Sequence, residues 1–526
     1  MNRVAQAEDM LQDFAAEAGA ASINNAVILP GLGVTIKATA EALFKRIGPT
    51  KTMFMRGGAV VGIIENSGAS AIEVIGPAAA RSRFECYAAF WVWRAGHNSE
   101  PVLKPAIIAQ EMAAALLESE EARTFLPSIT GLINCPVIVR ADRGFQIVGQ
   151  GYHPDTGLFI TGGRMPSLVQ LSKAIESLRE LVSEFDFQSP GDRSRALASF
   201  ITPALKLGGH LHGNVPADVA EADKSQAGKT YRQKLVAAVY NEIPSLVTCR
   251  SGGVGSVDES LNAQLIAGRP FIQLDNFRGR FDSPHIEAFL TAEQSFPVRV
   301  PHCPEVAIDP SRFFVMLTSN GVETTRDFAN RGSIVRIRKR ERYTFRRYPE
   351  GDLLDHVRAC QPDYLGAVFA IVQGWMESGR PHSNETRHDF REWVQTLDWI
   401  LQNALREAPL MDGHQAAQER VSDPALTFLR KLTLAVAEQN RLGESLIASA
   451  LYEIADSAGV DIPGLREPDE DKGKRMIGTI MARLFKTTSS LSLDGFTVTR
   501  HEAETERRDG DGTYTAKTYQ FERIAR

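Results

Sequence analysis

The stretch Glu221-Ala-Asp-Lys-Ser-Gln-Ala-Gly-Lys-Thr-Tyr231 is typical of a loop that binds phosphate groups. Such a loop turns tightly before a helix, so that backbone N–H groups face the anion. In this pattern Lys229 is expected to reach the β- and γ-phosphates of ATP as a catalytic residue, and Thr230 to hold Mg²⁺. The predicted nucleotide-binding residues of the loop are Ser225, Gln226, Ala227, Gly228, Lys229, Thr230 and Tyr231.

Two apolar segments downstream of this loop each end in polar residues. The segment Arg269-Pro-Phe-Ile-Gln-Leu-Asp-Asn276 predicts a buried strand, and Asp275 near its end would hold the Mg²⁺ shell together with the loop threonine. The segment Arg312-Phe-Phe-Val-Met-Leu-Thr-Ser-Asn320 predicts a second buried strand, and Asn320 at its tip would position the attacking water. Asp275 and Asn320 are therefore predicted catalytic residues.

A pair of arginines follows these strands. The stretch Arg326-Asp-Phe-Ala-Asn-Arg331 leads into a third predicted strand, Ser333–Ile337. Ring-forming ATPases keep at this point an arginine that reaches the γ-phosphate bound by the neighbouring subunit. Loop, acid-tipped strand, amide-tipped strand and arginine come in the order and at the spacing of an AAA+ ATPase. The sequence therefore predicts an α/β fold with an AAA+ P-loop core.

The composition fits a protein with several hydrophobic cores. The chain has 526 residues, of which 43% are hydrophobic and 23% are charged, and its net charge is −5. This balance gives no bulk attraction for nucleic acid, so any DNA contact must come from local basic patches. The five cysteines form no Cys-x-x-Cys pair, which argues against a zinc ribbon or a disulfide framework. With neither a signal-peptide core nor an apolar run near the roughly 20 residues of a membrane span, a cytoplasmic protein without membrane contact is expected.

The sequence pattern divides the chain into three expected domains. Residues 1–165 mix short strands and helices and predict an α+β domain for assembly or for binding a partner. Residues 166–410 predict the AAA+ ATPase domain, with a helical lid from Asp352 to Asn403. Residues 424–526 predict helices followed by a β-hairpin, which is typical of a winged helix.

Local basic residues suggest where DNA would bind. Lys474 and Arg475 begin the expected recognition helix of the winged helix, and Arg483 lies later on it. A helical cap with a β-arm is the alternative, because basic residues often belong to a solvated face. Arg299 and His302 lie between the two predicted strands of the ATP site and could reach DNA phosphates in the pore of a ring. A buried strand edge explains the same pattern.

The ordered set of motifs resembles the helicase portion of primase–helicase proteins carried by bacteriophages, prophages and mobile elements. Those proteins are similar to superfamily 3 helicases within the AAA+ class. The stretches Pro127–Val139, Gly151–Leu158 and Pro190–Ala204 add to the resemblance, which covers about residues 120–400. It implies a homo-oligomeric ring, expected to be a hexamer, that hydrolyses ATP and moves along single-stranded or forked DNA.

The sequence departs from the family pattern at two positions. Asp223 stands where the loop usually has its first glycine, and an acidic side chain there would weaken phosphate binding unless it faces away. Asn276 follows Asp275 where many AAA+ enzymes place a catalytic glutamate. The family tends to carry an acid on the helix predicted at Val257–Leu265, which makes Glu259 the candidate for activating water. An ATPase that binds ATP and turns over slowly is the alternative.

The family's paired-arginine pattern favours Arg331 over Arg326 as the arginine finger. The alternative is that one of them forms a salt bridge with Asp327 and the other is solvated. The first 165 residues lack both a cysteine-rich zinc module and the spaced acid pair of a two-metal polymerase site. We therefore expect a helicase subunit without priming activity, for which a separate primase or another replication protein is an expected partner.

The predicted function is an ATP-dependent DNA helicase or translocase that serves the replication of a phage or mobile element. The alternative is a nucleotide-switched DNA-binding ATPase, such as an initiator or a defence component, that assembles on DNA without unwinding it. A protein-remodelling ATPase is a third class, and the absence of an obvious aromatic-glycine pore loop weighs against it.

Overall fold

The computed structural model describes residues 25–524, except for 67, 96–100, 142–143, 223–225, 248–255, 278–279, 300–304, 321–322, 341, 464, 466–468 and 507–512. Contacts divide the chain into two compact units. The first comprises Met1–Phe277, Ser283–Asn320 and Arg331–Asp412, and the second comprises Arg278–Asp282, Gly321–Asn330 and Gly413–Arg526. The predicted boundaries of three domains stay predictions.

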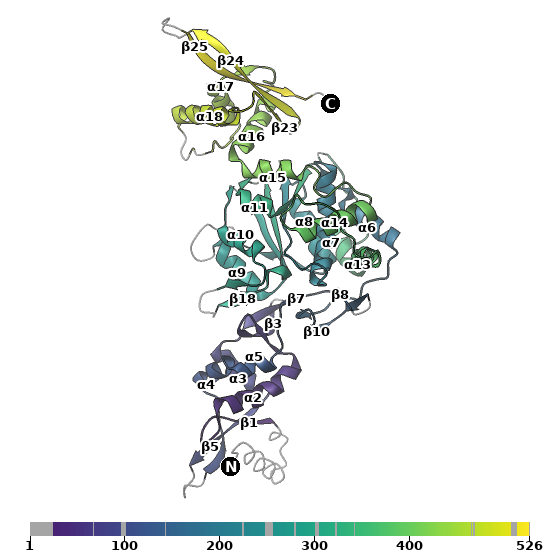
Figure 1. The fold of residues 1–526 in the computed structure, drawn as a ribbon, viewed down its shortest axis with the longest axis vertical. Helices are drawn as coiled ribbons and strands as arrows, with labels where there is room; N and C mark the ends of the chain where they lie inside the picture. Colours follow the sequence, from purple (N-terminus) through teal and green to yellow (C-terminus); the bar gives the residue numbers. More distant parts are fainter. Residues whose placement is uncertain are drawn as a thin grey trace. The chain divides into compact units, whose positions relative to one another are not determined.

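The first part of unit one is built from short helices and small sheets (Figure 1). Its elements are β1 (Ala26–Ile28), α2 (Ile36–Ile47), η2 (Gly48–Thr50), β2 (Met53–Arg56), β3 (Ala59–Asn66), β4 (Ala69–Val74), α3 (Pro77–Glu85), β5 (Ala89–Ala95), β6 (Pro101–Pro105), α4 (Gln110–Leu117), α5 (Glu120–Phe125), β7 (Gly131–Ile133), β8 (Val137–Arg140), β9 (Phe145–Val148), β10 (Gly151–His153) and β11 (Leu158–Ile160). They form the sheets β1-β5-β6, β2-β3-β4, β10-β11-β7 and β8-β9.

The predicted start of one helix in this part is wrong. Helical spacing predicts a helix from Lys104 to Glu120, but residues 101–105 form strand β6, which pairs antiparallel with β5. Helix α4 begins only at Gln110. Pro105 lacks a backbone N–H and is poorly suited to a helix interior, so the cross-strand partner decides the local structure.

A six-stranded sheet forms the centre of unit one, in the order β12-β21-β13-β19-β15-β14. Its strands are β12 (Asp186–Phe187), β13 (Ala217–Ala222), β14 (Ser245–Leu246), β15 (Phe271–Phe277), β19 (Phe314–Asn320) and β21 (Gly332–Arg338). Only β12 runs antiparallel to its neighbour, whereas β21, β13, β19, β15 and β14 are parallel. The carboxyl ends of parallel strands meet at one edge, where α/β proteins bind ligands. That edge therefore carries the ends of β13, β15 and β19.

Helices cover this sheet, with shorter elements between them (Figure 1). They are α6 (Leu171–Ser183), α7 (Pro190–Leu207), α8 (Lys229–Val239), α9 (Val257–Ala267), α10 (Pro284–Thr291), α12 (Leu353–Ala359), α13 (Gln361–Glu377), α14 (Arg391–Trp399) and η4 (Ile400–Ala404), and the shorter elements are β17 (Phe296–Val298), β18 (Val306–Ile308) and η3 (Pro310–Arg312). Elements α12, α13, α14 and η4 occupy the segment where a helical lid is predicted.

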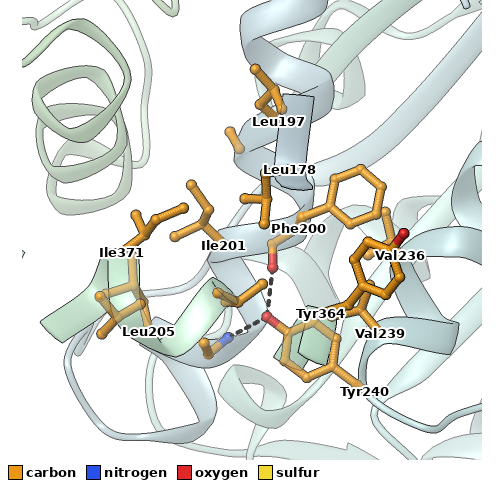
Figure 2. Close-up of a cluster of buried hydrophobic side chains, with 14 of the residues drawn as sticks. Leu178, Leu197, Phe200, Ile201, Leu205, Val236, Val239, Tyr240, Tyr364 and Ile371 are labelled. Atoms are coloured by element: carbon orange, nitrogen blue, oxygen red, sulfur yellow. Dashed lines mark hydrogen bonds between the residues drawn. The ribbon is translucent and has the colours of Figure 1, made fainter. Parts of the chain in front are cut away.

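Helix α7 lies at the centre of the largest hydrophobic core. Ser189 caps it by accepting a hydrogen bond from the Asp192 backbone N–H, and Pro190 occupies its first turn. Figure 2 shows its side chains packed against those of α6, α8 and α13, with Leu197, Ile201 and Leu205 among them. Because nearly all residues of α7 are buried, the core is built around this helix.

A tyrosine hydroxyl bridges one turn of α7. Tyr240 donates a hydrogen bond to the carbonyl of Phe200 (2.6 Å) and accepts one from the backbone N–H of Ala204 (3.0 Å) (Figure 2). Pro203, next to this turn, interrupts the helical hydrogen bonds because it has no N–H. Burial raises the pKa of the Tyr240 phenol well above its ordinary value, so this hydroxyl stays protonated and keeps its donor.

Unit two holds the C-terminal helices and a second core. Its elements are β16 (Arg280–Phe281), β20 (Glu323–Thr324), α11 (Arg326–Asn330), α15 (His414–Ser422), α16 (Pro424–Glu438), β22 (Ser445–Leu446), α17 (Ala448–Ser457), α18 (Glu470–Leu484), β23 (Ser490–Leu493), β24 (Phe496–Glu506) and β25 (Thr513–Arg523). The last strands form the antiparallel sheet β22-β25-β24-β23, which packs with α16, α17 and α18 around a core containing Leu432, Ile477 and Phe521. The expected helices and β-hairpin are present, and the winged-helix assignment stays a prediction.

Among the helices of the described residues, none combines the length and the apolar character needed to cross a lipid bilayer.

Candidate nucleotide-binding site

The predicted phosphate-binding loop joins the end of β13 to the start of α8. Its described residues form a tight turn, in which Gln226 has a φ of 61° and Gly228 a φ of 90°. A Cβ atom on Gly228 would lie 2.9 Å from Cε1 of Phe185, so both the backbone and the neighbouring ring favour glycine here. Asp223 and Ser225 lie outside the described residues. The N-terminus of α8, which attracts anions, begins at Lys229.

Buried polar contacts fix α8 on the sheet. Arg232 forms a salt bridge with Asp218 of β13, and the Arg232 side chain is fully buried. The Gln233 amide donates to the carbonyls of Asp218 (2.9 Å) and Leu317 (3.3 Å), which belong to adjacent strands. These contacts set the position of the first turn of α8, and therefore of Lys229 and its neighbours, relative to the strand ends.

The loop threonine meets the predicted acid at the sheet edge. Thr230 Oγ1 donates a 2.6 Å hydrogen bond to Oδ1 of Asp275. Thr318 of β19 donates a second hydrogen bond of 2.6 Å to the same carboxylate oxygen. A hydroxyl and a carboxylate are ligands that Mg²⁺ prefers, and Lys229 at the start of α8 is nearly buried. This donor set fits the Mg²⁺ and the phosphates that the sequence predicts.

Thr318 is a site residue that sequence reasoning missed. Its contact depends on the pairing of β15 with β19, in which the register shifts between Leu274 and Phe277. The only available signal was the polar end Thr-Ser-Asn320 of the strand, in which only the asparagine was assigned a role.

For the remaining predicted catalytic residues, the structure gives the backbone position but no side-chain contact that would show a catalytic role. Asn320 is the last residue of β19, which lies between β13 and β15, but its side chain is outside the described residues. Glu259 lies in the first turn of α9, where its backbone N–H donates to Oγ of Ser256 (3.3 Å). The side chain of Asn276 is also outside the described residues. The catalytic roles of Asn320 and Glu259 stay predictions.

The predicted arginine finger contacts helix α10 of its own chain. The Arg331 guanidinium donates to the backbone carbonyl of Glu287 (3.1 Å), and the Glu287 carboxylate lies 3.9 Å away. The Arg331 side chain is 22% exposed. Arg326, the alternative finger, is the first residue of α11 in unit two.

Tyr231 joins α8, the helix after the loop, to α12 in the predicted lid segment. Its hydroxyl accepts a 2.8 Å hydrogen bond from the backbone N–H of Leu354, in the first turn of α12. Burial raises the pKa of Tyr231 to about 12. Asp352 caps the same helix by accepting from the Asp355 N–H (3.0 Å). The predicted loop residue Tyr231 is thus tied directly to α12, in the segment where a lid is predicted.

A cavity of about 460 Å³ opens beside the loop. Gln226, Ala227 and Gly228 form part of its wall, and residues 184–186 and 338–340 form another part. Its volume falls within the range of about 300–1,000 Å³ that small-molecule sites occupy. The cavity lies within unit one and is contiguous with the loop predicted to bind phosphate.

The described residues among those predicted to bind DNA each make one or two polar contacts within the chain. Arg299 is exposed after β17, and its backbone carbonyl accepts from the Asn262 amide (3.2 Å). His302 lies outside the described residues. In unit two the three basic side chains contact their own unit, through the ion pairs Lys474–Glu470 (2.5 Å) and Arg483–Asp423 (3.3 Å) and the hydrogen bond from Arg475 to the Asp471 carbonyl (3.2 Å).

Comparisons with solved structures give distant likenesses, two of which illustrate their extent. No family model matches this sequence, and no curated protein matches it. The A form apo structure of the NrS-1 C-terminal region is 11% identical with a TM-score of 0.35, and the match covers 91% of this chain and 98% of that one. An active helicase, SCCmec type IV Cch, is 10% identical with a TM-score of 0.30, covering 90% and 97%. At these identities and TM-scores neither likeness establishes the function of this chain.

Proposed function

We propose that this chain is an Mg²⁺-dependent ATP hydrolase that uses ATP to move along DNA, as the helicase or translocase of a phage or mobile element. One observation carries the proposal. The hydroxyl of Thr230 and the carboxylate of Asp275 meet directly beside a tight loop and a helix N-terminus. That combination offers an anion site and a cation site next to each other, as an Mg²⁺-bound nucleotide requires.

Each side chain of the site has a role in this proposal. Lys229 would neutralise the β- and γ-phosphates, while Thr230 and Asp275 would hold the Mg²⁺ that bridges them. The bound ion would neutralise charge that develops on the phosphate oxygens. Thr318 would orient Asp275 through its 2.6 Å hydrogen bond. Asn320 would position the attacking water, and Glu259 would accept its proton.

The proposed assembly is a ring, with a hexamer as the expected state. In such a ring Arg331 would stabilise the transition state in the site of the neighbouring subunit. Its present hydrogen bond to the Glu287 carbonyl holds the guanidinium on its own α10. Binding to a neighbour would therefore exchange this contact for one to the γ-phosphate.

The proposed partner is single-stranded or forked DNA. Lys474, Arg475 and Arg483 on α18 would contact its phosphates, as would Arg299 in unit one. Each of these residues would supply a sequence-independent contribution, which suits a motor that moves along any sequence. A primase or another replication protein remains the proposed additional partner.

The alternative is an ATP-switched DNA-binding protein that assembles without unwinding. One feature of the chain favours it: the residue after Asp275 is Asn276, which cannot act as a carboxylate base. In that case ATP would be bound at the same loop, and its slow hydrolysis would only time the release of DNA.

Unwinding of a forked DNA substrate separates the two functions. The proposal predicts strand separation that requires ATP and Mg²⁺ and is lost in Lys229→Ala. A protein that binds ATP and the fork, yet separates no strands under these conditions, would support the switch and contradict the motor.

A further inference from the structure

A basic and aromatic segment covers the cavity beside the loop. The segment Arg338–Tyr348, here called the strap, begins at the last residue of β21, and six of its eleven residues are Arg or Lys while three are aromatic. All of its described residues except Arg340 and Tyr348 are exposed. Five of its side chains nevertheless line the cavity, namely those of Arg338, Lys339, Arg340, Phe345 and Arg346.

Acidic residues of α6 hold the strap in this position. Oε1 of Glu184, at the end of α6, accepts from the backbone N–H of Arg346 (2.7 Å) and from the Tyr343 hydroxyl (3.3 Å). The Arg346 guanidinium forms an ion pair with Glu180 of the same helix. The middle of this exposed basic strap is thus held at the cavity by Glu180 and Glu184.

The two ends of the strap are also fixed. At its start, Arg338 donates to the backbone carbonyl of Gln188 (3.0 Å). At its end, Tyr348 exchanges backbone hydrogen bonds with Gly351 and stacks on His356 of α12, with ring centroids 4.3 Å apart. The strap is therefore anchored to the end of α6, to the segment before α7 and to the lid.

The phosphate-binding loop and its neighbour Phe185 form another part of the cavity wall. Phe185 lies against Gly228, and Tyr231 follows Lys229 and Thr230 in the first turn of α8. A nucleotide whose phosphates bind to this loop must place its sugar and base in the space next to the loop. The cavity of about 460 Å³ begins at those loop residues.

The lining suits a nucleoside in its chemistry. The rings of Phe185 and Phe345 provide apolar faces on which a base can stack, and a guanidinium plane such as that of Arg340 provides another. Asp186 and Asp352 supply carboxylates that can accept hydrogen bonds from ribose hydroxyls or from a base amino group. Phe345 is 59% exposed, so a base would cover apolar surface that now faces water.

We infer that the strap forms the nucleoside site: the base and ribose of a nucleoside triphosphate bind between Phe345 of the strap and the loop wall near Phe185. Glu184 is a positioning residue that holds the strap in place. This inference rests on the proposed function, because it takes the loop as the site of the phosphates. Basic and aromatic segments also bind single-stranded nucleic acid, but the position of five strap side chains around the cavity favours the nucleotide.

The test compares ATP with inorganic tripolyphosphate, which occupies only the phosphate site. Binding of each to the full chain is measured by calorimetry with Mg²⁺ for the wild type, Phe345→Ala and Arg347→Ala. Arg347 is an exposed strap residue outside the cavity lining, so its variant controls for the general effect of strap charge. Phe345→Ala should weaken ATP on the order of tenfold, as for the loss of one stacking contact, and leave tripolyphosphate unchanged. Arg347→Ala should weaken neither by more than about twofold, which is less than 0.5 kcal/mol.

Three results would overturn the inference. ATP affinity that is unchanged in Phe345→Ala would show that the base lies elsewhere. Equal weakening of ATP and tripolyphosphate would show that the strap acts on the phosphates. Weakened binding of a fluorescent oligo(dT) with unchanged ATP affinity would assign the strap to DNA. If the wild type binds neither ATP nor tripolyphosphate, the proposed function itself fails. This outcome can be told apart from the three results above, because each of them requires a wild type that binds ATP.

A second variant tests the positioning role of Glu184. Glu184→Gln keeps an amide oxygen that can accept from the Arg346 N–H but removes the negative charge that faces the basic strap. The ATP affinity of Glu184→Gln should fall by less than that of Phe345→Ala. The ATP affinity of Glu184→Ala should fall further than that of Glu184→Gln. Equal ATP affinities for the wild type and both Glu184 variants would show that the strap needs no such anchor.

Discussion

Thr230 and Asp275 are 45 residues apart in the sequence, yet their side chains form a 2.6 Å hydrogen bond at the carboxyl edge of the central sheet. The loop and helix α8 supply the hydroxyl, and strand β15 supplies the carboxylate. Their meeting follows from parallel pairing, because β13 and β15 both flank β19 and end at the same edge. The following predictions depend on this geometry or on the core that supports it.

Asp275→Asn should remove Mg²⁺-dependent hydrolysis while the fold is retained. The amide is nearly the same size and can still accept a hydrogen bond from Thr318, but it lacks the charge that holds the ion. Turnover should fall by about hundredfold or more, since a bound metal supplies several kcal/mol of transition-state stabilisation. Phosphate release is measured over a Mg²⁺ titration, with the exposed Asp461→Asn as control. A variant with the Mg²⁺ dependence of the wild type would contradict the assigned role.

Arg331→Ala should be inactive alone and active in mixtures. If each site combines Lys229 of one subunit with Arg331 of the next, Arg331→Ala should lose about a thousandfold in turnover. Mixing it with inactive Lys229→Ala subunits creates some interfaces with both native residues, so hydrolysis should return. Arg326→Ala, the alternative finger, should stay active. Mixtures that never regain activity would argue against a shared site.

Tyr240→Phe should destabilise unit one without altering the nucleotide site directly. The hydroxyl bridges Phe200 and Ala204 in a fully buried turn of α7. Its loss removes two buried hydrogen bonds from groups that must then pair with each other by tightening the helix or stay unpaired, which costs about 1–3 kcal/mol of unfolding free energy. Urea unfolding measures the change, and Tyr343→Phe on the exposed strap should change stability by less than about 0.5 kcal/mol. Equal stability of the two variants would mean that the bridge contributes nothing.

Acid sensitivity should depend on His210. Burial lowers the pKa of His210 from 6.5 to about 4, and its ring contacts the Ile138 carbonyl (3.0 Å). The unfolded chain binds this proton more tightly, so the stabilising contribution is full above pH 6.5 and is lost as the pH falls towards 4. His210→Gln can still donate to Ile138 but cannot titrate, so its unfolding free energy should fall less over this range. The exposed His501→Gln should behave as the wild type.

Local patterns predict the strands and the helix that carry the candidate ATP site. The runs before Asp275 and Asn320 are apolar with polar tips, so they could be recognised as buried strands, and Gly-Lys-Thr230 marks a helix start wherever it occurs in such a loop. The stretch Thr52–Ile64 likewise predicts a hairpin that turns at Gly57-Gly58, and β2 and β3 form it, with both glycines at positive φ. Short-range chemistry decides these features, and the sequence displays it directly.

Features that depend on pairing between distant segments could not be predicted. Thr318 reaches Asp275 only through the register of β15 with β19. Strand β6 replaces the start of the helix expected from Lys104 because β5 pairs with it. The strap contacts Glu184 across a separation of 162 residues, which no local pattern reveals. The catalytic roles proposed for Glu259 and Arg331 likewise depend on contacts with substrate or with a neighbouring subunit.

The decisive measurement is ATP hydrolysis by the purified chain, with and without single-stranded DNA and beside Lys229→Ala. We expect Mg²⁺-dependent turnover that rises when DNA is added and disappears in the variant, because Lys229 is proposed to bind the phosphates. Nucleotide binding with no turnover under either condition would contradict the motor and favour the switch. No nucleotide binding at all would show that the loop, with Asp223 in place of glycine, does not hold phosphate.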